Sequence, residues 1–120
     1  MRELVMRAIL TALFLTIATQ AGAECGNLCD SVWWQSAKKA DVQAELDAGA
    51  DVMARNKYGG TSLHYAANYG TPANVQALLD AGADAKAKNK DGKTPWDYAK
   101  ENEKLKGTKG YWALNDAQYN

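Results

Sequence analysis

Few residues of this chain could carry out catalysis or bind a metal. His64 is the only histidine, Cys25 and Cys29 are the only cysteines, and the acidic residues are balanced by an equal number of basic ones. His64 has neither a nucleophile nor a pair of carboxylates at a spacing that would form a catalytic set. A zinc site built from both cysteines and His64 would lack a fourth ligand. The sequence therefore predicts no catalytic, metal-binding or cofactor-binding residue, and we expect the chain not to be an enzyme.

The two cysteines suit a disulfide better. They stand close together in Cys25-Gly-Asn-Leu-Cys29, which is not the Cys-x-x-Cys spacing of redox-active pairs. In an oxidising compartment an even number of closely spaced cysteines favours a bridge over a metal site. We predict a Cys25–Cys29 disulfide, with a redox-active pair as the alternative.

The first residues of the chain have the pattern of a secretory signal peptide. Two arginines precede an apolar run at residues 8–18, and Ala21-Gly22-Ala23 provides small residues for cleavage. The run is shorter than the ~20 apolar residues of a membrane-spanning helix, so we expect no membrane insertion after signal removal. The alternative is an N-terminal helix of the mature fold. The pattern predicts a signal peptide at 1–23, one domain at 24–120, and a periplasmic or secreted location.

Composition narrows the class of partner. Lys plus Arg and Asp plus Glu are both 14 in a chain of 120 residues, and 47% of the residues are hydrophobic. That content is ordinary for a globular domain. Nucleic-acid binding normally requires a basic excess, which the chain lacks. We therefore expect no nucleic-acid partner.

Two blocks of sequence repeat with one period. Leu-Asp-Ala-Gly-Ala-Asp begins at Leu46 and again at Leu79, an offset of 33, and the Asn-Lys-x-Gly-x-Thr blocks at Asn56 and Asn89 have the same offset. This period, together with the segment Gly-Gly-Thr-Ser-Leu-His-Tyr-Ala-Ala at 59–67, resembles the ankyrin repeat family, in which each unit is a turn followed by two antiparallel helices. With its leader, the chain is similar to a small exported bacterial ankyrin repeat protein.

The resemblance implies an all-α solenoid of helix-turn-helix units with aromatic-rich capping repeats. We expect a partial repeat at 30–55, a full repeat at 56–88 and a capping repeat at 89–120. In the full repeat Thr61 is a favourable helix N-cap. Gly70 is expected to end the first helix in a left-handed conformation, and Gly82 is expected to end the second helix. Expected helices cover 31–37, 41–48, 62–69, 72–81, a segment from 94, and 111–117.

Apolar spacing separates core from surface. Leu63 and Ala66 of the first helix, and Val75, Leu78 and Leu79 of the second, are expected to point into the stack. Trp33, Trp34 and Trp96 replace smaller residues in the end units and should cover the exposed ends of the core; a ligand platform is the alternative. The resemblance implies that His64 has a structural role, hydrogen-bonding between Thr61 and a neighbouring loop.

The resemblance also implies a protein-binding surface on the turn tips and the exposed side of the inner helices. Tyr58 and Tyr69 are the expected anchors, because tyrosine supplies large contact area at low entropic cost. The positions carried over are Lys57, Tyr58, Gly60, Asn68, Tyr69, Lys90, Asp91, Lys93, Glu101 and Asn102.

These expectations lead to one functional hypothesis. We expect an exported, monomeric protein–protein interaction module that binds one partner protein of unknown identity. The alternative is an immunity-type inhibitor of a toxin or of an exported enzyme, which differs only in the partner.

Overall fold

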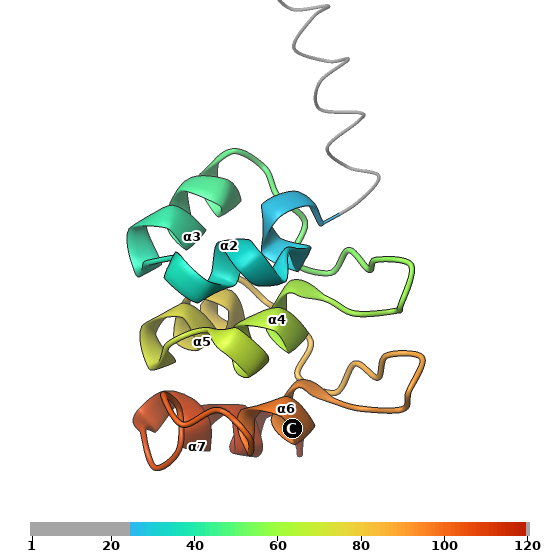
Figure 1. Ribbon diagram of the computed structural model, residues 1–120, viewed down its shortest axis with the longest axis vertical. Coiled ribbons are helices and arrows are strands. Elements are labelled where there is room, and N and C mark those ends of the chain that lie inside the picture. The colour runs from blue at the N-terminus through green and yellow to red at the C-terminus, as the bar shows by residue number, and fades with distance from the viewer. Residues whose placement is uncertain (1–24, 120) are drawn as a thin grey trace, which may run out of the picture.

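The computed structural model describes residues 25–119, and the predicted signal peptide lies outside the described residues (Figure 1). Within 25–119 a short 3-10 helix precedes six α-helices, and there are no strands. The elements are η1 (Gly26–Cys29), α2 (Ser31–Ser36), α3 (Lys39–Asp47), α4 (Ser62–Tyr69), α5 (Pro72–Asp80), α6 (Pro95–Ala99) and α7 (Lys109–Ala117).

The helices form three antiparallel pairs that stack on one another (Figure 1). The inner helices α2, α4 and α6 pack in succession, and so do the outer helices α3, α5 and α7. A single pair is too small to bury its own apolar face, so each pair shares a core with its neighbours. The predicted all-α solenoid is confirmed.

Threonines precede the helices of the last two units, and the helix that follows Thr108 begins two residues before the start that the sequence predicted for it. Thr61, Thr71, Thr94 and Thr108 are the N-caps of α4, α5, α6 and α7, each with an extended backbone. The Thr108 hydroxyl accepts a hydrogen bond from the Tyr111 backbone N–H at 3.2 Å, which satisfies a free amide of the first turn. Proline follows the cap in α5 and α6, at the position where its missing N–H costs nothing. Observed and predicted ends differ by about two residues.

One predicted helix end was wrong in detail. Gly70 follows α4 with φ −87° and ψ −173°, an extended conformation rather than a left-handed one. A glycine is required at this position for a different reason, because a Cβ there would lie 2.7 Å from the carbonyl oxygen of Ala66. Gly82 follows α5, as expected, and has a positive φ of 93°.

The core runs along the whole stack. Leu63 and Ala66 of α4 and Val75 and Leu78 of α5 are fully buried, as predicted. Leu79 is only partly buried, so its placement in the centre of the core was wrong. The other large side chains that are fully buried are Leu28, Trp34, Val42, Leu105 and Leu114.

Aromatic side chains cover both ends of the core. Trp34 is buried and its indole N–H donates to the Leu28 carbonyl at 2.7 Å. Trp33 packs edge-on against it with ring centroids 5.0 Å apart. At the other end Trp96 lies 4.5 Å from the ring of Tyr111, whereas Trp112 is half exposed. The end units are therefore capping units rich in aromatic residues.

The predicted disulfide is present. Cys25 and Cys29 are joined at either end of η1. The sulfur of Cys25 is buried and lies 3.2 Å from the carbonyl oxygen of Ala54. The bridge thus holds the first described residues against the segment that enters the full repeat.

The helices of the described part of the chain are all too short, or too polar, to cross a membrane.

Candidate binding groove

Two turns project from the same side of the stack (Figure 1). We call residues 55–60 finger 1 and residues 88–93 finger 2. In finger 1 the Gly59 N–H donates to the Asn56 carbonyl, and the Asn56 N–H donates to the Gly60 carbonyl, both at 2.9 Å. The Asn56 side-chain oxygen accepts from the backbone N–H groups of Tyr58 and Gly60. Gly59 has a φ of +75°, which other residues rarely adopt.

Finger 2 repeats this geometry one period later. Asn89 Oδ1 accepts from the N–H groups of Asp91 and Lys93, both at 3.0 Å, and Gly92 has a φ of +75°. The identical asparagine and glycine positions explain why the two turns have the same conformation.

The fingers are tied to each other. The guanidinium of Arg55 donates to the carbonyl of Gly59 at 3.0 Å and to the carbonyl of Lys88 at 2.9 Å. The Lys90 N–H donates to the carbonyl of Tyr58 at 3.0 Å. Since these contacts link backbone to backbone across the repeat boundary, the fingers form one fixed surface.

His64 lies beneath the fingers as a further link. Its Nδ1 accepts a hydrogen bond from the Thr61 N–H at 3.1 Å, so Nε2 carries the hydrogen and donates to the Lys93 carbonyl at 2.9 Å. Burial lowers the pKa of His64, outweighing the opposite effect of the Lys93 carbonyl. The ring is therefore held neutral and in one tautomer. These are the structural contacts that the resemblance implied.

Asp97 takes the place of His64 in the last unit. Its Oδ2 accepts from the Thr94 N–H at 2.9 Å and from the Thr94 hydroxyl at 3.2 Å. The Thr94 N–H lowers the pKa of Asp97 by stabilising the carboxylate. No further finger follows in the described residues, so a side chain that caps only its own helix is sufficient here.

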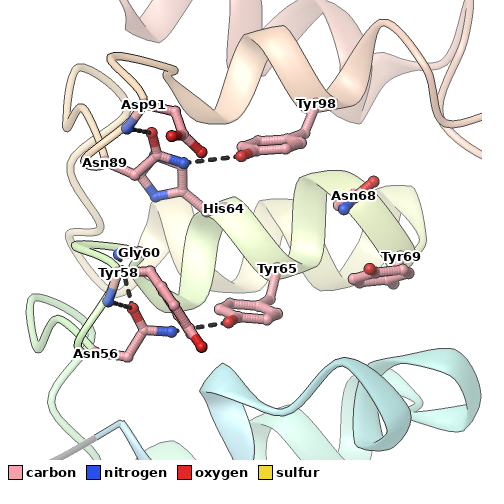
Figure 2. Close-up of a pocket in the computed structure, with 10 residues that line it drawn as sticks. All are labelled: Asn56, Tyr58, Gly60, His64, Tyr65, Asn68, Tyr69, Asn89, Asp91 and Tyr98. Atoms are coloured by element: carbon pink, nitrogen blue, oxygen red, sulfur yellow. Dashed lines mark hydrogen bonds between the residues drawn. The ribbon is translucent and has the colours of Figure 1, made fainter.

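A groove of about 240 Å³ lies between the fingers and α4 (Figure 2). Four tyrosine side chains line this groove. The Asn56 amide donates to the Tyr65 hydroxyl at 2.8 Å, and one repeat later the Asn89 amide donates to the Tyr98 hydroxyl at the same distance. The lining residues are Asn56, Tyr58, Gly60, His64, Tyr65, Asn68, Tyr69, Asn89, Asp91 and Tyr98.

The family model for ankyrin repeats in many copies matches residues 44–99. Residues 44–99 are therefore ankyrin repeats. The matched segment includes both fingers and the whole groove lining. A search of curated proteins found no match. Ankyrin repeats are generally protein–protein interaction modules and are typically not enzymes.

Five of the predicted contact positions line the groove of this ankyrin domain. Tyr58 is 62% exposed and stands at the tip of finger 1. Tyr69 was expected to project into solvent, but it is partly buried and packs against the core. Gly60 is buried in its turn. Asn68 and Asp91 complete the set.

The other five positions lie outside the groove. Lys57, Lys90 and Lys93 are exposed on the fingers, and Glu101 is exposed after α6. Asn102 was expected on the surface and is instead buried. Its amide donates to the carbonyls of Ala67 and Gly70, both at 3.0 Å, and so joins the last unit to the end of α4.

Sequence reasoning missed several lining residues. Asn56 and Asn89 enter the sequence argument only as the starts of the repeated blocks, and Tyr65 and Tyr98 are not among the predicted contact positions. The 33-residue period could have indicated them, since it superimposes Asn56 on Asn89 and Tyr65 on Tyr98. Within residues 25–119 no group of three or more histidine, cysteine or acidic side chains is arranged to hold a metal.

Proposed function

We propose that this ankyrin repeat protein is an exported interaction module that binds one partner protein through the groove and the two fingers. The observation that carries the proposal is the groove itself, which four tyrosine rings line between two turns of identical conformation. Tyrosine is enriched among residues that dominate binding energy at protein interfaces.

The rigidity of the surface supports the same function. Arg55 and the Lys90 backbone hold the fingers in place before any partner arrives. Binding to a pre-ordered surface avoids the cost of ordering loops. Tyr58 stands above this surface with most of its ring exposed.

The groove does not favour catalysis. His64, the only histidine of the chain, lines the groove, and both of its ring nitrogens are engaged in hydrogen bonds. A general base needs a free lone pair within reach of the substrate proton. We therefore propose a binding role without enzymatic activity.

The export proposal has two supports. The first is the sequence pattern of a signal peptide at 1–23, which lies outside the described residues. The second is the Cys25–Cys29 disulfide, because disulfides persist in oxidising compartments. Mass spectrometry of protein from the periplasm or medium should find Glu24 as the first residue and no free thiol. Recovery of the chain in the cytoplasm with Met1 intact and both thiols free would contradict export.

An inhibitor of a toxin or of an exported enzyme is the second candidate. The tie between the fingers favours it, because a rigid face suits tight inhibition. An activity assay on a captured enzyme, with and without the purified ankyrin protein, distinguishes inhibition from simple binding.

Capture from a periplasmic extract tests the binding surface. Tyr58→Ala should weaken retention of the partner about tenfold, or about 1.4 kcal/mol. Tyr119→Ala is the matched control, because Tyr119 is 78% exposed and lies outside the groove. A partner retained equally by both variants would show that the groove is not the contact surface.

A further inference from the structure

Positive charge is concentrated on the two fingers, although the chain as a whole has no net charge. Lys57, Lys88, Lys90 and Lys93 are all exposed, and Asp91 is the one acidic residue of the two fingers. The ion pairs within the described part of the chain, Lys100–Asp97 and Lys106–Glu103, involve none of these lysines. The finger charges are thus available to a partner.

The lysines also border the aromatic groove. The ammonium of Lys57 lies 5.2 Å from the ring centroid of Tyr58, and that of Lys93 lies 5.6 Å from the ring centroid of Tyr98. A carboxylate that approached either lysine would therefore come directly to the edge of the groove.

Hydrogen bonding fixes which groups the groove offers. Asn56 Oδ1 accepts from two backbone N–H groups, so its amide nitrogen must point to Tyr65 and donate to the phenol oxygen. The phenol hydrogen of Tyr65 has no acceptor among the described residues. Asn89 orients Tyr98 in the same way. The groove thus presents two phenol donors, one from each repeat, together with the Asp91 carboxylate as an acceptor.

This combination fits a polypeptide main chain. An extended peptide alternates C=O acceptors, which suit the phenols, with N–H donors, which suit Asp91. A DNA backbone offers phosphate acceptors but no hydrogen-bond donor that would suit Asp91. The lysines on either side require acidic side chains on that peptide.

We infer that the groove takes an extended acidic segment of the partner protein, with its carbonyls on the hydroxyls of Tyr65 and Tyr98 and its carboxylates on the finger lysines. This inference rests on the proposed function and specifies the chemistry of the partner.

Fluorescence anisotropy with the purified full chain tests the inference. The probe is a fluorescein-labelled peptide of alternating Glu and Thr, which favours an extended conformation. The comparison probes are the same peptide with Gln in place of Glu, and a labelled oligothymidylate of equal length. We expect the acidic peptide to bind about tenfold more tightly than either comparison probe, and its affinity to fall as salt increases.

Matched variants locate the binding. Lys57→Gln with Lys90→Gln should weaken binding of the acidic peptide about fivefold, whereas Lys39→Gln with Lys109→Gln removes the same charge from α3 and α7 and should have no effect. Tyr65→Phe with Tyr98→Phe removes both phenol donors and should weaken binding of the acidic and the Gln peptide alike. Tyr119→Phe is its control. Circular dichroism checks that each variant is folded. If the tyrosine double variant does not fold, the variants of the exposed finger lysines still test the inference.

Three outcomes would overturn the inference. They are failure of the acidic peptide to bind, tighter binding of oligothymidylate, and equal losses in the finger and helix lysine pairs. The proposed function is tested separately. A partner whose capture depends on Tyr58 but not on the finger lysines would support the binding groove and contradict the acidic segment, whereas capture that does not depend on Tyr58 would contradict the groove itself.

Discussion

His64 of the full repeat donates to the backbone carbonyl of Lys93 in the next unit, with 2.9 Å between Nε2 and the oxygen. The same ring accepts from the Thr61 N–H through Nδ1. The bond from Thr61 requires the neutral form, because a protonated Nδ1 would face the Thr61 N–H with a second hydrogen, whereas Nε2 donates in either form. One buried ring thus joins the start of α4 to the base of finger 2.

The first prediction concerns the pH dependence of stability. Burial lowers the pKa of His64 below its ordinary value of 6.5, so the unfolded chain binds a proton at a higher pH than the folded chain. The free energy of unfolding should be constant above 6.5 and should fall with decreasing pH below it, until the lowered pKa is reached. Urea titrations between about pH 5 and pH 8 measure this. In His64→Gln the stability should be lower throughout and this slope should be absent; an equal slope in both proteins would contradict the assignment.

The second prediction concerns the core of α5. Leu78 is fully buried, so Leu78→Ala should lower the free energy of unfolding by about 2 to 5 kcal/mol. Leu79 is partly buried, and Leu79→Ala should cost clearly less. Gln76→Ala on the exposed side of the same helix is the control, expected within about 0.5 kcal/mol of the original chain. Chemical denaturation that ranked Leu79→Ala as the more damaging change would show that the orientation of α5 is wrong.

The third prediction concerns the contact between α5 and α7. A Cβ on Gly110 would lie 2.8 Å from the Cα of Pro72, closer than real atoms approach. Gly110→Ala should therefore destabilise the protein by about 1 to 3 kcal/mol, although alanine is the better helix former. Lys109→Ala, at the exposed neighbouring position, should have little effect on the melting temperature. A Gly110→Ala protein that melts higher than the original would mean that the two helices are farther apart.

The fourth prediction concerns the disulfide. The short Cys25–Cys29 ring should contribute about 2 kcal/mol by restricting the unfolded chain. Reduction should lower the melting temperature, and Cys25→Ser with Cys29→Ser should lower it by a similar amount. Because the serine variant has no bridge to reduce, added reductant should leave its melting curve unchanged. A shift in that curve would mean that the reductant acts elsewhere.

Local signals in the sequence predicted most of the helices. The 33-residue period gave the number and order of units, and threonine followed by proline marked the starts of α5 and α6. These features act through residues close in the chain, so they can be interpreted without a fold. Gly70 shows the limit, since a glycine indicates that a side chain is excluded but not whether backbone conformation or a near neighbour excludes it.

Contacts between units were harder to predict. Asn102 has a polar side chain of the kind that is usually found on the surface. Only the folded stack brings the Ala67 and Gly70 carbonyls to its amide. Tyr65 and Tyr98 share a register that the period gives, yet the bond from each asparagine depends on how each finger lies against the helix that follows it. Half of the groove lining therefore became visible only with the fold.

The stacking order also has a consequence for the time scale on which parts of the molecule open. The α4–α5 pair has neighbours on both sides, whereas α2–α3 and α6–α7 each have one within the described residues. In such one-dimensional arrays the ends fray while the centre exchanges its amide hydrogens only when the whole array opens. The amides of Ala66 and Ala67, which lie beyond the first turn of buried α4, should be the slowest to exchange with deuterated solvent. The helix that lines the groove is therefore expected to be the part of the molecule that opens least often.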